Sequence, residues 1–122
     1  MIPAGVQVFL ALEPVDMRFG FDRLSGMVRE RMGYEPRCGA LFVFVGRRRQ
    51  LVKILFADAT GTCVFSKRLD EGAFSLPPSP SADATHVEID DATLDALLDG
   101  ISITPDGGHV RASSPRRRRR VH

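Results

Sequence analysis

Residues 41–69 consist of three runs rich in β-branched and aromatic side chains. A basic turn separates the first two runs, and a turn that begins with Asp58 and contains Gly61 separates the last two. Short runs joined by turn residues in this way are typical of an antiparallel meander. The pattern therefore predicts three consecutive strands, at about 41–45, 51–56 and 62–68.

The first of these strands is expected to lie inside the sheet. Strand side chains alternate between the two faces, and here both alternating sets are apolar: Leu41, Val43 and Val45 on one face, Phe42 and Phe44 on the other. A strand that is apolar on both sides is typical of the centre of a sheet that is covered on both faces. One of the two covers is expected to be a helix.

The lysines and arginines of the other two strands fall on both faces. Lys53 shares its row with Leu51 and Leu55, so its ammonium needs either a carboxylate or an opening to solvent, because burying it unpaired would cost several kcal/mol. In the third strand, Arg68 alternates with Lys67, which places the two side chains on opposite faces.

The sheet region is strongly basic. Residues 37–68 carry seven Lys or Arg against a single acid, Asp58, which gives this segment a net charge of +6. A small sheet with such a charge suggests a polyanionic partner. The residues predicted to contact nucleic acid are Arg47, Arg48, Arg49, Lys53, Lys67 and Arg68. The alternative is that the three turn arginines form a solvated hairpin tip whose charge only keeps the sheet soluble.

Charge elsewhere is just as uneven. Residues 83–110 carry seven acids and no lysine or arginine, and residues 111–122 carry six arginines. The helical region of the acidic segment, residues 86–101, is interpreted either as a helix packed on the core with solvated carboxylates or as a docking surface for a basic partner. A further alternative is a mimic that screens the basic sheet until DNA competes. The arginine-rich end either adds nonspecific affinity for nucleic acid or is incidental.

Further elements are predicted outside the meander. An apolar run predicts a first strand at 6–12, and apolar residues at helical spacing predict a helix at about 20–32 that ends at Gly33. A short alternation predicts a strand at 86–90, followed by a helix at about 91–99. Asp90 or Asp91 is expected to cap that helix, and Gly100 to close it.

These elements predict a single α+β domain over residues 1–104. Its fold is an antiparallel β-sheet meander of four to five strands with one covering helix and a short C-terminal helix. Residues 77–85, rich in proline and serine, are expected to form an internal linker. Residues 105–122 are expected to be a disordered basic tail.

Several ordered blocks of the chain resemble the TnpB-type accessory protein of the insertion sequence sixty-six family, the small product of the second reading frame of these bacterial elements. The blocks are Val15-Asp-Met-Arg-Phe-Gly-Phe-Asp22, Leu41-Phe-Val-Phe44 with Arg47-Arg48, then Lys53, Asp58 and Gly61, and Lys67-Arg-Leu-Asp-Glu-Gly-Ala-Phe74 followed by Pro77. The resemblance runs from about residue 2 to 103. The chain departs from the family in having no tryptophan: Phe56-Ala57 precedes Asp58, and Leu76 precedes Pro77.

The resemblance implies a non-catalytic accessory factor for transposition that assists a separate transposase, through contacts with duplex DNA or through protein contacts alone. The transposase would then be the basic partner of residues 86–101. It also marks a second candidate site, made of Asp16, Arg18, Asp22 and Asp58. In a structural interpretation, Asp16 caps the approach to the helix and Arg18 pairs with Asp22 or Asp58; in a functional one, Arg18 contacts phosphate or a partner.

No enzyme or metal signature is found. Two-metal phosphodiester chemistry needs carboxylates that hold cations about 4 Å apart, and Asp58 is better explained as a turn residue. We expect no cofactor and no metal. Cys38 and Cys63 are expected to be buried free thiols. No apolar run approaches the length of a membrane span and no signal peptide is evident, so a cytoplasmic location is expected.

Overall fold

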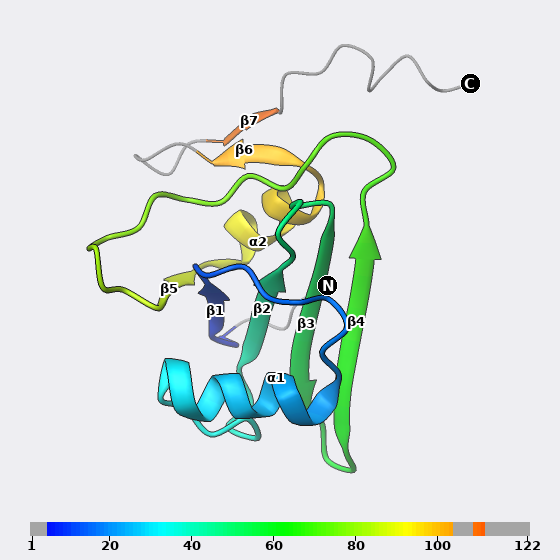
Figure 1. Ribbon diagram of the computed structural model, residues 1–122, viewed down its shortest axis with the longest axis vertical. Coiled ribbons are helices and arrows are strands. Elements are labelled where there is room, and N and C mark those ends of the chain that lie inside the picture. The colour runs from blue at the N-terminus through cyan, green and yellow to red at the C-terminus, as the bar shows by residue number, and fades with distance from the viewer. Residues whose placement is uncertain (1–4, 104–108, 112–122) are drawn as a thin grey trace.

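The computed structural model describes residues 5–103 and 109–111. Its centre is a five-stranded sheet in the order β4-β3-β2-β1-β5 (Figure 1). The strands are β1 (Val8–Ala11), β2 (Leu41–Val45), β3 (Leu51–Ala57), β4 (Thr62–Arg68) and β5 (His86–Ile89). The three strands of the predicted meander are confirmed, and β2 lies in the middle of the sheet with both of its faces covered.

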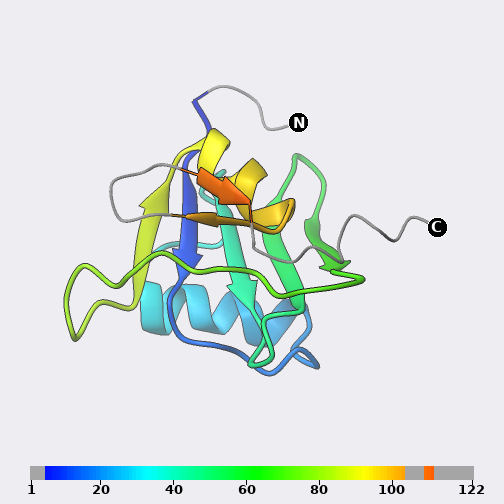
Figure 2. The ribbon, with the colours of Figure 1, turned by 90° about the horizontal axis from the view of Figure 1, so that it is seen from above.

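Helices cover the sheet on both sides. Helix α1 (Phe21–Met27) and the π-helical segment η1 (Val28–Met32), which continues it, lie on one face, and α2 (Asp91–Leu98) lies on the other (Figure 2). Leu24 and Val28 pack with Phe42 and Phe44 in the core beneath α1. A second core, on the α2 face, is formed by Val8, Leu10, Val43, Val45, Val52, Ile54, Phe74, Leu94 and Leu97. The α+β class and both helices are therefore confirmed.

Local sequence signals set the helix ends where they were predicted. Gly33 follows η1 in the left-handed conformation (φ 81°), and its amide donates to the carbonyl of Val28. Asp90 caps α2, because its carboxylate accepts a hydrogen bond of 2.8 Å from the amide of Thr93. Gly100 (φ 77°) follows α2 at its other end.

The strands β1 and β2 pair in parallel, whereas the other pairs of the sheet are antiparallel. The long connection through α1 and η1 carries the chain back across the sheet, so that β2 runs in the same direction as β1. A short hairpin turn can join only antiparallel strands. The sheet is therefore mixed, with an antiparallel meander of β2, β3 and β4 beside a strand–helix–strand unit.

The connection from β4 to β5 contains no helix or strand between residues 69 and 85. Because β4 and β5 are opposite edges of the sheet, this segment has to cross the sheet. It is anchored on the way: Phe74 is only 1% exposed and packs in the core on the α2 face. The predicted linker, 77–85, is the second half of this connection.

Two further strands, β6 (Ile101–Ile103) and β7 (His109–Arg111), pair with each other in a separate antiparallel ribbon. The strand β7 falls inside the segment that was predicted as a tail. The rest of that segment, residues 105–108 and 112–122, lies outside the described residues.

The prediction that both cysteines are buried was wrong. Both cysteines are free, but Cys38 is exposed and Cys63 is half-buried. Cys38 lies in a turn closed by its own amide, which donates to the carbonyl of Glu35 at 3.0 Å, and not on a strand that packs against the core.

Candidate nucleic-acid interface

The turn between β2 and β3 presents three consecutive exposed arginines, Arg47, Arg48 and Arg49. It is closed by a hydrogen bond of 3.0 Å from the amide of Gly46 to the carbonyl of Leu51. Arg49 adopts the left-handed conformation (φ 58°), which is uncommon for a residue other than glycine. The chain reverses direction here within a few residues, so the three side chains project from a well-defined tip.

The connection after β4 fixes this turn from behind. The carbonyl of Gln50 accepts a hydrogen bond of 2.8 Å from the amide of Leu69, and the carbonyl of Arg49 accepts one of 2.5 Å from the amide of Phe74. Since Phe74 is itself in the core, the basic turn is tied to the folded body and is not a free loop.

The segment 15–17 lies against the other side of the turn. The amide of Val15 donates to the carbonyl of Val45 at 3.1 Å, and Val15 forms a parallel bridge with Gly46. A Cβ atom added to Gly46 would lie 2.6 Å from Cγ of Met17, which is closer than such atoms approach in proteins. Glycine at position 46 therefore allows the two segments to touch.

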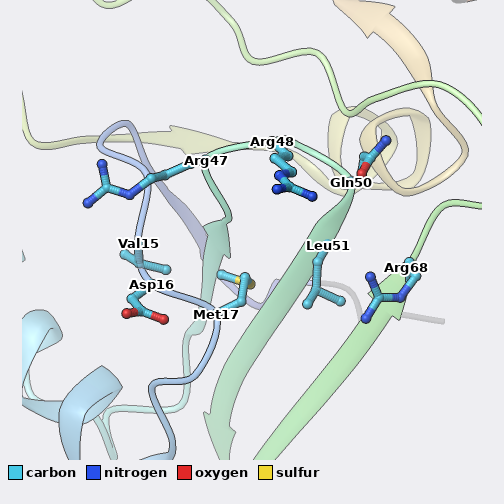
Figure 3. A pocket seen from close by; sticks show the side chains of 8 residues that line it. All are labelled: Val15, Asp16, Met17, Arg47, Arg48, Gln50, Leu51 and Arg68. Carbon is cyan, nitrogen blue, oxygen red and sulfur yellow. The ribbon is translucent and has the colours of Figure 1, made fainter.

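A pocket of about 360 Å³ opens between these segments and the end of β4 (Figure 3). Arg47 and Arg48 reach it from the turn, and Arg68 reaches it from β4, where it is paired in register with Leu51. Asp16 lines it from the segment 15–17, below Arg47 in Figure 3, with its carboxylate directed away from Arg48 and Arg68. In the part of the chain that the structure describes, none of these three arginines forms an ion pair at hydrogen-bonding distance. We call this opening the basic pocket. It is lined by Val15, Asp16, Met17, Arg47, Arg48, Gln50, Leu51 and Arg68.

Asp16 is held ionised at the rim of the basic pocket. Nε of Arg18 donates to its Oδ1 at 3.0 Å and the guanidinium Nη2 donates to its Oδ2 at 2.6 Å, and the amide of Arg18 also donates to Oδ1 at 2.9 Å. These bonds, with the nearby charge of Arg47, hold the pKa of the Asp16 carboxyl well below its usual range. The predicted pairing of Arg18 with Asp22 or Asp58 was wrong, because Asp16 lies within reach on the same tight turn. The Arg18 side chain remains 90% exposed.

The two lysines of the predicted set are directed elsewhere. Nζ of Lys53 donates to the carbonyl of Phe19 at 3.0 Å and ties the approach to α1 onto the sheet. Nζ of Lys67 donates to the carbonyl of Leu98 at 2.8 Å, at the C-terminal end of α2, where a cation is favourable. The structure thus brings Arg47, Arg48 and Arg68 together, with Arg49 next to them in the turn.

Asp58 lies at the far end of β3 from the basic pocket and is part of the β3–β4 turn. Its Oδ1 accepts hydrogen bonds of 2.9 Å from the amides of both Thr60 and Gly61. These bonds lower the pKa of the Asp58 carboxyl. The pKa of the Cys63 thiol is raised, mainly by desolvation and to a smaller extent by the negative charge of Asp58. Asp22 lies exposed in the first turn of α1. The aspartates of the second candidate site are therefore not gathered at one place.

We expect Asp58→Ala to lower the melting temperature at neutral pH, because the two turn amides lose their acceptor. The folded-state pKa of Asp58 is below its ordinary value of 3.8, so the stability that the carboxylate contributes is fully present above that value. It is lost as the pH falls below 3.8 through the lower pKa of the folded state. Melting curves of both proteins from pH 7 downward should therefore converge in acid. The exposed Asp70→Ala is the matched control, and a difference that is unchanged in acid would contradict the assignment.

The sequence pattern of the family described as IS66 Orf2 like protein matches residues 6–107, which is most of the chain. This chain belongs to the IS66 Orf2-like family. The match spans the sheet, both helices and every residue of the basic pocket, so the resemblance noted from the ordered blocks is confirmed. Members of this family are accessory proteins associated with the transposition of insertion sequences.

Two curated relatives of this IS66 Orf2-like chain come from Sinorhizobium fredii (strain NBRC 101917 / NGR234). The uncharacterized protein y4hO is 43% identical over 103 residues, which cover 83% of this chain and 87% of the relative. The uncharacterized protein y4jC is 30% identical over 100 residues, which cover 82% and 83% of the two chains. No solved structure is significantly similar.

The residues that the structure describes hold neither a cluster of metal ligands nor a long apolar helix. Within residues 5–103 and 109–111, no group of three or more His, Cys, Asp or Glu side chains is arranged to hold a metal ion. Within the same residues, no helix combines the length and the apolar character that crossing a membrane requires.

Proposed function

We propose that this protein is a non-catalytic accessory factor in the transposition of an insertion sequence, which assists the transposase by holding duplex DNA through its phosphates. The observation that supports the DNA contact is that Arg47, Arg48 and Arg68 line one open pocket and, among the described residues, form no ion pair at hydrogen-bonding distance. Family membership supports the role in transposition.

The chemistry of the basic pocket suits a phosphate group. A guanidinium presents rigid parallel N–H donors that match phosphate oxygens, and three arginines from two separate segments line one opening. Asp16, kept ionised by Arg18, repels anions from one side of that opening. A phosphate should therefore approach from the side of the turn arginines.

Recognition of base sequence is not part of the proposal. Tyr34 is the single tyrosine of the chain, and its ring stacks on Phe9 inside the fold, with centroids 4.3 Å apart. None of the described residues that line the pocket is aromatic. Contacts with phosphates alone fix the position of a protein on a duplex without reading its sequence.

The roles within the predicted set differ in this proposal. The three arginines of the basic pocket contact phosphates, and Arg49 adds positive charge beside them. Lys53 and Lys67 support the scaffold through their backbone acceptors Phe19 and Leu98 and add only long-range positive potential. A lysine held by a backbone carbonyl has to give up that bond, or share it, before it can bind a phosphate.

The test is a titration of duplex DNA with the full-length chain in which the five arginines 116–120 are replaced by glutamine, so that the chain end adds no charge. We expect binding that does not depend on sequence. The slope of log affinity against log salt should be about −0.9 per phosphate contact, or roughly −2.7 for three contacts. Fluorescence anisotropy with two unrelated labelled duplexes measures both quantities.

Two results would count against the DNA contact. Binding that vanishes when the terminal arginines are replaced would assign the affinity to the chain end alone. Absence of binding in the unaltered chain would favour a module that binds the transposase without touching DNA.

A further inference from the structure

In the described part of the chain, the α2 face of the sheet is only partly covered. Beside α2, over the ends of β3 and β4, a groove of about 400 Å³ remains open. Its lining is mostly apolar and comes from both β-strands, from α2 and from the residues that enter β1 and β2: Val6, Gly39, Leu41, Ile54, Phe56, Ala57, Phe65, Leu94, Asp95 and Leu98. We call it the apolar groove.

Phe65 is the most exposed of the large apolar side chains in this lining. It is 46% exposed and is one of two large apolar side chains in the described part of the chain that face solvent to this extent. It lies on β4, which is an edge of the five-stranded sheet. An exposed phenylalanine on an unpaired edge strand carries an association liability unless a partner covers it.

Acids border the apolar groove on the side of α2. Asp95 is one of its lining residues, and Asp91 and Asp99 lie one turn away on either side of Asp95 along α2. From Leu69 to Ile103 the chain has no lysine or arginine. Lys67, the basic residue of β4 on this face, is hydrogen-bonded to the carbonyl of Leu98. Among the described side chains, a partner that fills the groove therefore meets the carboxylate of Asp95 along one rim.

The apolar groove and the basic pocket lie on opposite faces and at opposite ends of the sheet. Ile54 and Phe65 face α2 near the β3–β4 turn, whereas Leu51 and Arg68 face α1 at the other end of the same two strands. Residues 54 and 65 are paired in register, as are residues 51 and 68. One molecule can thus hold a duplex at one corner and a protein at the other.

We infer that the apolar groove is a docking site for a segment of the transposase that carries apolar side chains flanked by lysine or arginine. The chemistry of the segment follows from the groove, in which an apolar floor needs apolar anchors and the carboxylate rim selects cations. The identity of the partner rests on the proposed function.

The experiment measures binding of the full-length chain to the purified transposase of the same element, and to overlapping peptides that cover that transposase. Phe65→Thr removes the exposed ring from β4 and keeps a residue that favours strands. Asp95→Lys reverses the charge at the rim. We expect each change to weaken binding about tenfold, and the charge reversal also to reduce the dependence on salt.

The matched controls are Phe21→Ala, which removes the other exposed ring, and Glu30→Lys, which makes the same charge change on η1. Both lie on the opposite face of the sheet, and both should leave binding of the transposase and of the peptides unchanged. A peptide that binds wild-type chain but not Phe65→Thr should contain both apolar and basic residues.

Three outcomes would overturn this inference. The first is that the wild-type chain binds neither the transposase nor any peptide, and the second is that the groove variants bind as well as the controls. The third is that light scattering shows a dimer that Phe65→Thr abolishes, which would make a second copy of the chain the occupant of the groove. A measurement of DNA affinity separates this inference from the proposed DNA contact. Phe65→Thr and Asp95→Lys should each bind duplex DNA as tightly as the wild-type chain does, whether or not they bind the transposase.

Discussion

Replacing Arg47, Arg48 and Arg68 with alanine should weaken binding to any duplex by about 10- to 100-fold at moderate salt, since hydrogen bonds between charged groups typically contribute more than those between neutral ones. The slope of log affinity against log salt should fall by up to about 2.7, because each lost phosphate contact releases one fewer counterion. Fold stability should change little, since all three side chains are exposed.

Two further triple variants sharpen this result. Lysine at the same three positions keeps the charge but loses the two-pronged geometry, so we expect intermediate affinity with a nearly unchanged salt slope. Alanine at Arg23, Arg29 and Arg31 removes the same charge from the outer surface of α1 and η1. If that control lowers DNA affinity as much as the pocket variant does, only overall charge matters and the basic pocket has no special role.

Phe74→Ala should destabilise the fold by about 3–5 kcal/mol, which is the usual cost of removing a fully buried phenylalanine. Phe74 lies in the connection between β4 and β5, is 1% exposed, and packs with Val52, Leu94 and Leu97 between the sheet and α2. Its amide also holds the carbonyl of Arg49, so loosening this segment should reduce DNA affinity as well.

Urea denaturation measures this loss. Phe74→Leu, which refills most of the volume, should lose clearly less than the alanine variant, and Phe21→Ala should change stability by no more than about 0.5 kcal/mol because its ring is exposed. A loss below about 1 kcal/mol for Phe74→Ala would show that the connection contributes little to the core on the α2 face.

Features that depend on a few neighbouring residues could be predicted from the sequence. The strands of the meander follow from alternation and turn residues, and the ends of the helices follow from Gly33, Asp90 and Gly100. The basic turn was also correctly located, because three successive arginines can hardly be anything but exposed.

Features that depend on contacts between distant segments of the chain could not be predicted from the sequence. Alternation places Lys67 and Arg68 on opposite faces, but it does not reveal that the face of Lys67 meets the end of α2. The contact between Met17 and Gly46 likewise depends on how the chain enters α1, so the share of Val15 and Met17 in the basic pocket was missed. The family-like block at 15–22 was the signal that pointed to this segment.

The position of β1 inside the sheet has a consequence for biosynthesis. This strand is made before the other four strands of the sheet, yet its two neighbours are β2 and β5. The strand β5 leaves the ribosome only when residues 86–89 do. All four of its side chains are buried in the finished protein. A nascent chain that stalls before β5 therefore presents β1 as an apolar, unpaired edge, which is a template for aggregation. Premature termination in this stretch should yield insoluble fragments and not a smaller working domain.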